Sequence, residues 1–172
     1  SDFIKNSEIN KQAVVLNGKL NHFLTITFDK TYKVTDYNYK NKGTIKDLSL
    51  KLNQTIKNSF LKNEISKLYL KDTELNTQYN MAKKNEIIAK GKYSFNDNDY
   101  QNFNLENKFL KESYNLDINL DISEAFKIIT LNYEKEINKI GNLVLKIQKK
   151  DDDFFIKKFN LTENKNSILI ND

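Results

Sequence analysis

The chain of 172 residues contains no cysteine, proline, tryptophan or arginine, and its single histidine is His22. The absence of cysteine excludes a disulfide framework, a thiolate zinc site and a cysteine nucleophile. One histidine leaves almost no scope for imidazole chemistry, and the sequence has neither a glycine-rich phosphate loop nor a Gly-x-Ser-x-Gly elbow. We therefore expect a protein that is not an enzyme, with no catalytic residue, no metal site and no cofactor.

All 28 basic residues are lysines, and together with 23 acidic residues they give a formal net charge of +5. The sequence pI of about 9.1 raises the question of nucleic-acid binding. However, the lysines are spread along the chain in runs no longer than two, and without arginine there is no bidentate group for phosphate or guanine. We expect a solvated lysine-rich and asparagine-rich surface and no nucleic-acid partner.

No apolar run reaches the roughly 18–20 residues that a membrane-spanning helix needs, and no signal peptide is visible. The sequence starts at Ser1 and its only methionine is Met81, which indicates a piece excised from a longer chain. We expect that any membrane anchor lies in parts of the parent chain outside this sequence. No proline-rich or glycine-rich linker divides the chain, so we expect a single β-rich domain over residues 1–172, with residues 1–17 as a lead-in segment.

Apolar and polar residues alternate with period 2 along most of the chain, which is typical of β-strands. The alternating segments cover residues 20–28, 48–52, 73–81, 87–95, 103–109, 114–122, 143–147, 154–156 and 159–161. Polar clusters that favour turns separate many of them, at residues 29–31, 40–43, 96–99, 151–153 and 162–166. Because such short connections join antiparallel neighbours, the sequence predicts an all-β or β-dominated fold, a long antiparallel meander of about ten strands.

Helical spacing is weak, and we expect at most one to three short helices. The candidates are residues 7–16, residues 54–64 and residues 133–140, in each of which a few apolar residues lie near helical spacing. Each candidate is close to the minimum length of a helix, so a strand or loop remains open for all three.

One hexapeptide pattern, an apolar residue followed by two others and then apolar-x-Leu, recurs at residues 45–50, 65–70, 100–105, 140–145 and 156–161. In a regular strand, residues three positions apart lie on opposite faces. The first apolar residue of the hexapeptide can share a face with the next one only if a β-bulge adds one residue to the strand. Bulges bend strands, so the repetition predicts a curved sheet. Such a sheet can cover its apolar face by closing as a barrel, by folding over as a sandwich or groove, or by packing a helix.

The apolar side chains of the strands are expected to face one interior and to form the lining of an open groove or half-barrel. The residues assigned to this lining are Leu48, Leu50, Leu68, Leu70, Leu116, Ile118, Leu120, Leu143, Leu145, Phe159 and Leu161. The polar residues considered for a functional site are expected to have structural roles. His22 is expected to be a hydrogen-bonded or pocket-edge histidine. Asn96 to Asp99 is expected to be a hairpin turn that lacks the glycine and glutamate of a calcium loop, and Asp151 to Asp153 a solvated turn.

The pattern of short strands near the end of the chain resembles the AsmA/TamB/YhdP-type envelope proteins. The residues that carry the resemblance are NLVLKI at 142–147, DFFIKKFNL at 153–161 and SILI at 167–170, and the similar pattern extends over residues 18–172. Residues 86–109 also resemble the OstA-type strands of lipopolysaccharide-transport proteins. These resemblances rest on strand pattern, because the AsmA-type family has no invariant catalytic motif.

The resemblance implies a non-enzymatic segment of a periplasmic bridge that passes phospholipid or another acyl-chain lipid along an apolar β-groove between membranes. Its partners would be lipid acyl chains, with the membrane anchor elsewhere in the parent chain. Two other functions fit the residues. One is a structural or adhesin-like β-sandwich interaction module, and the other is a lipocalin-like barrel that carries one small ligand.

Overall fold

The structure, a computed structural model, describes residues 13–57, 63–81, 84–110, 113–128, 132–137, 139–150 and 153–171. Every regular element in these ranges is a β-strand, which confirms the predicted fold class. The strands are β1 (Ala13–Phe28), β2 (Val34–Ile56), β3 (Ile65–Asn80), β4 (Asn85–Phe95), β5 (Gln101–Leu110), β6 (Ser113–Ile122), β7 (Phe126–Ile128), β8 (Tyr133–Lys135), β9 (Gly141–Lys150), β10 (Asp153–Glu163) and β11 (Asn166–Asn171).

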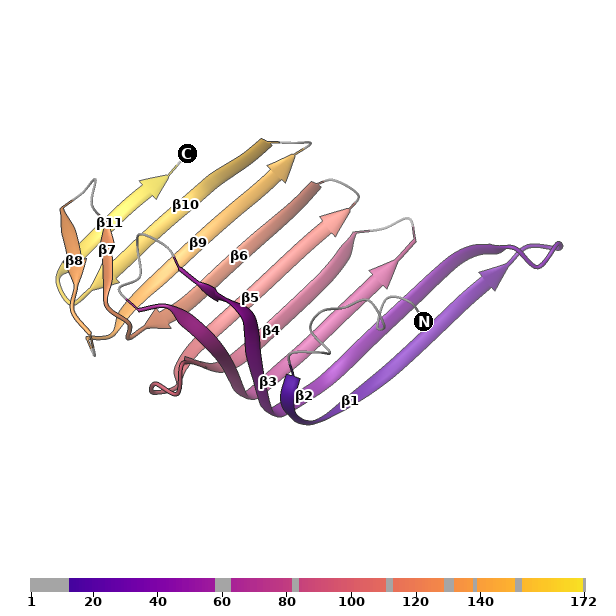
Figure 1. Cartoon of the computed structure of the whole chain (residues 1–172). Coiled ribbons are helices and arrows are strands. Elements are labelled where there is room, and N and C mark those ends of the chain that lie inside the picture. Colours follow the sequence, from indigo (N-terminus) through magenta and orange to yellow (C-terminus); the bar gives the residue numbers. More distant parts are fainter. Residues whose placement is uncertain are drawn as a thin grey trace.

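Nine of the strands form one antiparallel sheet in the order β1-β2-β3-β4-β5-β6-β9-β10-β11 (Figure 1). The chain leaves this meander once, between β6 and β9, where β7 and β8 form a separate two-stranded sheet. The large sheet is not closed: β1 and β11 are its two edges. The lipocalin-like closed barrel is therefore not the architecture, and among the described residues no second large sheet completes a sandwich.

One face of the large sheet is apolar and the other is polar. Residues directly opposite each other in paired strands lie on the same face. The pairing places one row across the sheet at Leu20, Gly43, Leu75, Ala89, Leu105, Ile118, Leu145, Phe159 and Ile170. On the opposite face, Asn142 Nδ2 donates to Asn119 Oδ1 (2.8 Å) and to Asp121 Oδ1 (3.0 Å), and Lys146 Nζ donates to Asp117 Oδ2 (2.8 Å).

Bulges occur at two of the five predicted phase shifts. One lies in β2 between Ile45 and Asp47, and the other lies in β10 between Ile156 and Lys158. For residues 65–70 the register shift falls on the partner strand, between Lys51 and Ile56. At residues 100–105 and 140–145 the prediction of a phase shift is wrong, because the first apolar residue precedes the strand and pairing there is regular.

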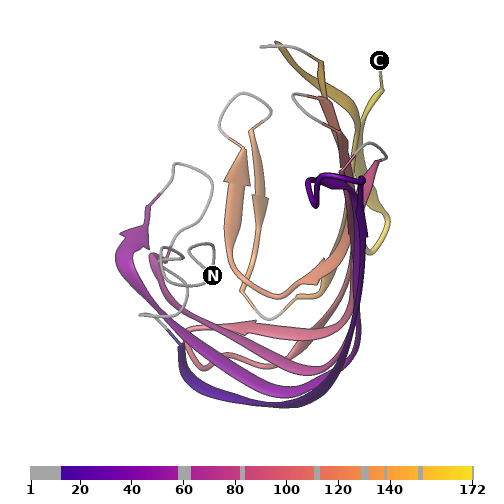
Figure 2. The same cartoon turned by 90° about the vertical axis from the view of Figure 1, so that its right-hand side faces the viewer.

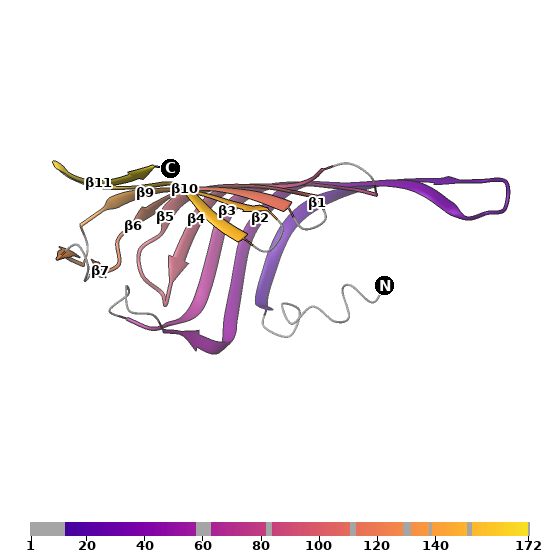
Figure 3. The ribbon, with the colours of Figure 1, turned by 90° about the horizontal axis from the view of Figure 1, so that it is seen from above.

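The sheet curves strongly, and Figures 2 and 3 show its arms rising to one side of a flatter wall. A bulge that the hexapeptide pattern does not mark lies in β3 between Lys71 and Glu74, where Asp72 has a φ of 46°. Gly91 of β4 lies beside this bulge, and a Cβ atom at Gly91 would be 2.6 Å from Thr73 Cα. Glycine is therefore required where the bent strand approaches its neighbour most closely.

The expected helices are wrong wherever the structure describes them. Residues 13–16 belong to β1, residues 54–56 end β2, and residues 133–135 form β8, while residues 7–12 and 58–62 lie outside the described residues. Pairing explains the difference, because backbone hydrogen bonds to a neighbouring strand outweigh a short and weak helical pattern. Residues 13–17, expected in the lead-in segment, are likewise part of β1.

Asparagine and aspartate close several of the hairpins, as the turn clusters predict. Asp29 Oδ1 accepts hydrogen bonds from the backbone N–H groups of Thr31 (2.7 Å) and Lys33 (3.0 Å). Asn96 and Asp97 adopt φ angles of 52° and 66° in the β4–β5 turn. The cluster at residues 40–43 is an exception. It lies inside β2, and its residues pair with the neighbouring strand and form no turn.

The structure predicts a difference between Leu161, which is 1% exposed, and half-buried residues of the same face such as Ile118. Leu161→Ala should lower the free energy of unfolding by about 2–5 kcal/mol because it leaves a cavity. Ile118→Ala should cost about 1–2 kcal/mol, because much of the side chain is already in water. Urea denaturation measures both values, and equal losses at the two positions would contradict this assignment of burial.

Candidate functional site

The apolar face is the concave one. The β7–β8 hairpin stands between the arms of the curved sheet (Figure 2), and it contacts the sheet through residues of the apolar face. Tyr133 Oη donates to Glu163 Oε2 (2.8 Å), and Glu163 follows Leu161 on the same face of β10. Lys135 lies against Gly141, where an added Cβ would be 3.4 Å from Lys135 Cδ. We call the apolar side of the nine-stranded sheet the concave face.

The pairing places all the predicted lining residues on the concave face. Between β2 and β3, Leu48 lies opposite Leu70 and Leu50 lies opposite Leu68. On β6, β9 and β10 the other residues form two rows, Leu120–Leu143–Leu161 and Ile118–Leu145–Phe159. Leu116 of β6 lies opposite Ile147 of β9. Leu161 is buried and the others are half-buried. Half-burial across so many neighbouring strands distinguishes this face from a closed core, in which such side chains would be inaccessible to solvent.

Two aliphatic rows run perpendicular to the strands. The first passes through Ile118, Leu145 and Phe159, and the second passes through Leu120, Leu143 and Leu161. The first crosses the entire sheet, whereas the second is aliphatic from β6 to β11 and meets Gly91 and Thr73 farther along. Neighbouring strands lie about 4.8 Å apart, so an apolar row across nine strands is about 38 Å long. This geometry provides a continuous hydrocarbon surface that is long in one direction and narrow in the other.

An aromatic row borders the aliphatic rows on the flatter wall. The ring centroids of His22 and Tyr39 are 6.0 Å apart, those of Tyr39 and Tyr79 are 6.2 Å apart, and those of Tyr79 and Phe109 are 6.1 Å apart. His22 Nδ1 and Tyr39 Oη share a hydrogen bond of 2.6 Å, which confirms the expected hydrogen-bonded histidine. Burial raises the pKa of Tyr79. The row was missed in the sequence because each ring comes from a different strand.

The concave face also contains polar groups between the aliphatic and aromatic rows. His22, Asn41, Thr77 and Asn107 lie at this level on β1, β2, β3 and β5. The Oδ1 atoms of Asn41 and Asn107 are buried and have no hydrogen-bond partner among the described residues. Buried acceptors of this kind are usually satisfied, so these two atoms are exceptions, and neither presents accessible surface to a bound molecule.

Buried charged groups hold the β7–β8 hairpin at the other end of the concave face. Lys135 is fully buried, and its Nζ donates to the backbone oxygens of Glu124 (2.8 Å) and Glu136 (3.0 Å). Burial lowers the pKa of Lys135, and the carboxylates of Glu163 and Glu124 oppose that shift. Burial, together with the hydrogen bond to Glu163, raises the pKa of Tyr133 to about 12.

Other polar candidates have structural roles in the parts of the chain that the structure describes. The side chain of Asn96 accepts from the backbone N–H groups of Ser66 (2.8 Å) and Lys67 (3.1 Å), so it anchors the predicted turn. Asp153 begins β10, whereas Asp151 and Asp152 lie outside the described residues. No group of three or more histidine, cysteine, aspartate or glutamate side chains among the described residues is arranged to hold a metal ion.

Comparison of the chain with protein-family models, curated proteins and solved structures gives no match. In the described ranges, no helix has the length and hydropathy to cross a bilayer.

We predict that Tyr133→Phe lowers stability by about 1.5–3 kcal/mol, because Glu163 loses a hydrogen-bond donor in a buried site. The pKa of Tyr133 is raised from 10.0 in the unfolded chain to about 12, so its contribution is fully present below pH 10. The contribution is then lost as the pH rises through 12, and the stabilities of the two proteins should converge in that window.

Urea denaturation of the parent and Tyr133→Phe at a series of pH values measures this convergence. Tyr32→Phe is the control, because Tyr32 is 88% exposed and its loss should leave the pH dependence unchanged. A difference between parent and Tyr133→Phe that stays constant above pH 10 would contradict the assigned shift.

Proposed function

We propose that this protein is a non-enzymatic lipid-binding segment whose concave face binds the acyl chains of lipids. The observation that supports the proposal is the apolar row across the nine-stranded sheet, which consists of Leu, Ile and Phe side chains with Gly43 and Ala89 among them. Soluble monomers rarely leave an apolar surface of this extent uncovered, and such surfaces mark binding sites. A hydrocarbon chain matches both the chemistry and the elongated shape of this surface.

The binding energy of such a ligand comes mainly from the hydrophobic effect. Each buried CH₂ group contributes roughly 0.8 kcal/mol, so a chain that covers several strands gains substantial affinity without any specific polar contact. The aliphatic row through Ile118 offers no hydrogen-bond donor or acceptor along its side chains. A chain bound there has no fixed register, and it can slide along the row at little cost.

The polar groups of a lipid have a place on the same face. His22, Asn41 and Asn107 place polar side chains between the aliphatic and aromatic rows. A lipid headgroup at this level would lie beside polar groups while its acyl chain follows the aliphatic row. This arrangement favours an amphipathic ligand over a pure hydrocarbon.

The resemblance of the chain to AsmA/TamB/YhdP-type envelope proteins extends the proposal to transport. In this role the segment would lie in the periplasm and would pass phospholipid along the concave face between membranes, anchored through other parts of its parent chain. The open edges at β1 and β11 allow the apolar face to continue into neighbouring segments.

We predict that Leu145→Glu and Phe159→Glu, made separately, reduce photocrosslinking of a photoactivatable fatty acid while the protein stays folded. Both side chains are half-buried on the concave face, so the new carboxylate remains partly hydrated and repels the chain. Val144→Glu is the matched control, because Val144 is a neighbouring half-buried residue on the opposite face and should leave crosslinking unchanged.

Thermal unfolding of each variant is measured alongside crosslinking. If Leu145→Glu and Phe159→Glu unfold the domain and the parent never captures the fatty acid, the concave face is an ordinary core and the proposal is wrong. Equal loss of crosslinking in Val144→Glu would also contradict it, because the effect would then not depend on the face.

A further inference from the structure

The hairpin formed by β1 and β2 extends well beyond the other strands (Figures 1 and 3). The pairing of β2 with β3 ends at Asn38 opposite Asn80, followed by one further hydrogen bond from Met81 N to Tyr37 O (3.4 Å). Beyond this point β1 and β2 pair only with each other, as far as Phe28 opposite Val34. We call residues 24–37 the ribbon.

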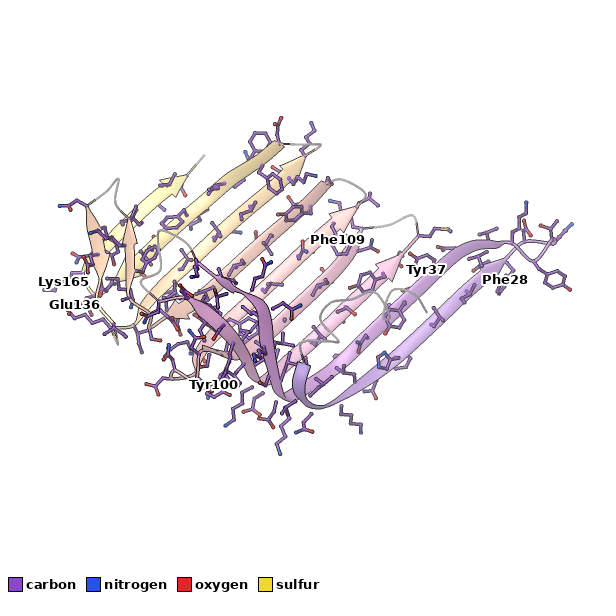
Figure 4. The ribbon with its side chains drawn as sticks, in the orientation of Figure 1. Phe28, Tyr37, Tyr100, Phe109, Glu136 and Lys165 are labelled. Carbon is purple, nitrogen blue, oxygen red and sulfur yellow. The ribbon has the colours of Figure 1, made fainter. Side chains whose placement is uncertain are left out.

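The ribbon is amphipathic. Cross-strand pairs place an apolar set on the side that continues the concave face, and these side chains are 36–60% exposed: Leu24, Ile26, Phe28, Val34 and Tyr37. Figure 4 shows Phe28 and Tyr37 on this projecting part. The opposite side carries Thr25, Thr27 and Asp36. A two-stranded ribbon with an exposed apolar face is only marginally stable in water, so it gains from contact with an apolar surface.

The tip of the ribbon has the composition of a membrane interface. Asp29 is engaged in the turn, where it accepts bonds from Thr31 and Lys33, and these bonds lower the pKa of its carboxyl. Tyr32 projects from the tip with 88% of its surface exposed, and Lys30 and Lys33 flank it. Within residues 24–37 two lysines and two aspartates balance, and three further lysines near the base of the ribbon, Lys19, Lys40 and Lys42, lie on the face opposite the apolar set.

We propose that the ribbon lies with its apolar face on the surface of a lipid bilayer that contains anionic lipids. Exposed aliphatic and phenyl groups would enter the boundary between headgroups and acyl chains, as the apolar face of an interfacial helix does. Tyrosine is favoured at that boundary, and lysines are attracted by anionic headgroups. The inference goes beyond the proposed function, since contact with a bilayer does not require a lipid on the concave face.

The lysines and the exposed tyrosine favour a bilayer over a second copy of the chain. Within the ribbon two lysines and two aspartates balance, but Lys30 and Lys33 flank Tyr32 at the tip, where Asp29 is engaged in the turn. Two copies of a chain of net charge +5 repel each other, whereas an anionic bilayer attracts this tip. The apolar set of the ribbon also lies on the same face of β1 as Leu20, with His22 between Leu20 and Leu24. A bilayer contact at the ribbon therefore brings the concave face next to its proposed ligands.

The experiment uses single-tryptophan reporters, which are unambiguous because the chain has no tryptophan. Phe28→Trp lies on the apolar side of the ribbon, and Phe23→Trp, at its base on the opposite side, is the matched control. With vesicles of phosphatidylcholine and phosphatidylglycerol, we expect a blue shift of Phe28→Trp emission and quenching by brominated acyl chains. We expect little change for Phe23→Trp, and little change for either reporter with phosphatidylcholine alone.

Two sets of substitutions test the cause of binding by vesicle flotation. Replacing both Ile26 and Phe28 by Thr should abolish flotation while keeping the strands, because threonine has high β-propensity. Replacing both Lys30 and Lys33 by Gln should weaken binding about 30-fold, since each lysine near an anionic surface contributes about fivefold. The loss of vesicle affinity caused by these two lysine substitutions should be smaller at high salt.

Several outcomes would overturn the inference. An unshifted Phe28→Trp spectrum, or equal shifts for Phe28→Trp and Phe23→Trp, would show that the apolar side does not enter the bilayer. A shift without vesicles that grows with protein concentration would identify a second copy as the occupant. Leu145→Glu should still float with vesicles, and this separates failure of the ribbon proposal from failure of lipid binding on the concave face.

Discussion

Each strand of the nine-stranded sheet has to keep its apolar side chains on the same face as its neighbours, because a slip of one residue moves the whole set to the other face. Simple alternation achieves this in a strand of 10 residues such as β6, but β2 has 23 residues and β3 has 16. The bulges near Lys46 and Asp72 change the phase, so Leu48 and Leu70 share a face with Ile45 and Thr73. Because bulges also bend strands, the same feature makes the apolar face concave.

A sheet of this kind has little buried core to stabilise it. Its stability depends on cross-strand pairs on both faces, and exposed ion pairs such as Lys146 with Asp117 contribute little individually. Buried groups lie where the β7–β8 hairpin covers the sheet, around Leu161 and Lys135, and also on the bent part of β2, β3 and β4, at Ile45, Thr73 and Tyr93. The apolar surface that folding leaves uncovered is the surface that a ligand can cover, and a ligand that binds only the folded state adds to stability.

The sequence predicts the antiparallel meander and the shared face of the eleven lining residues from Leu48 to Leu161, because alternation is a local property. Features that depend on register across strands could not be predicted in this way. The aromatic contact between Tyr79 and Phe109 joins β3 to β5, and the bulge at Asp72 has no hexapeptide to mark it. The buried Lys135 was unexpected, because three residues of β8 do not show enough alternation to outweigh a helical spacing.

The two ends of the concave face differ in a way that matters for an amphipathic ligand. At one end Lys135, Glu163 and Tyr133 form a buried polar group under the β7–β8 hairpin, which an acyl chain has no reason to enter. At the other end the aromatic row leads to the exposed ribbon, and β1 carries one apolar row from Leu20 to Phe28 through both regions. If the ribbon touches a bilayer, a lipid that leaves it meets tyrosine and phenylalanine side chains before the aliphatic rows. Access from the ribbon end then requires no opening of the sheet, because this side of β1 is exposed from His22 to Phe28 and only His22 interrupts its apolar residues.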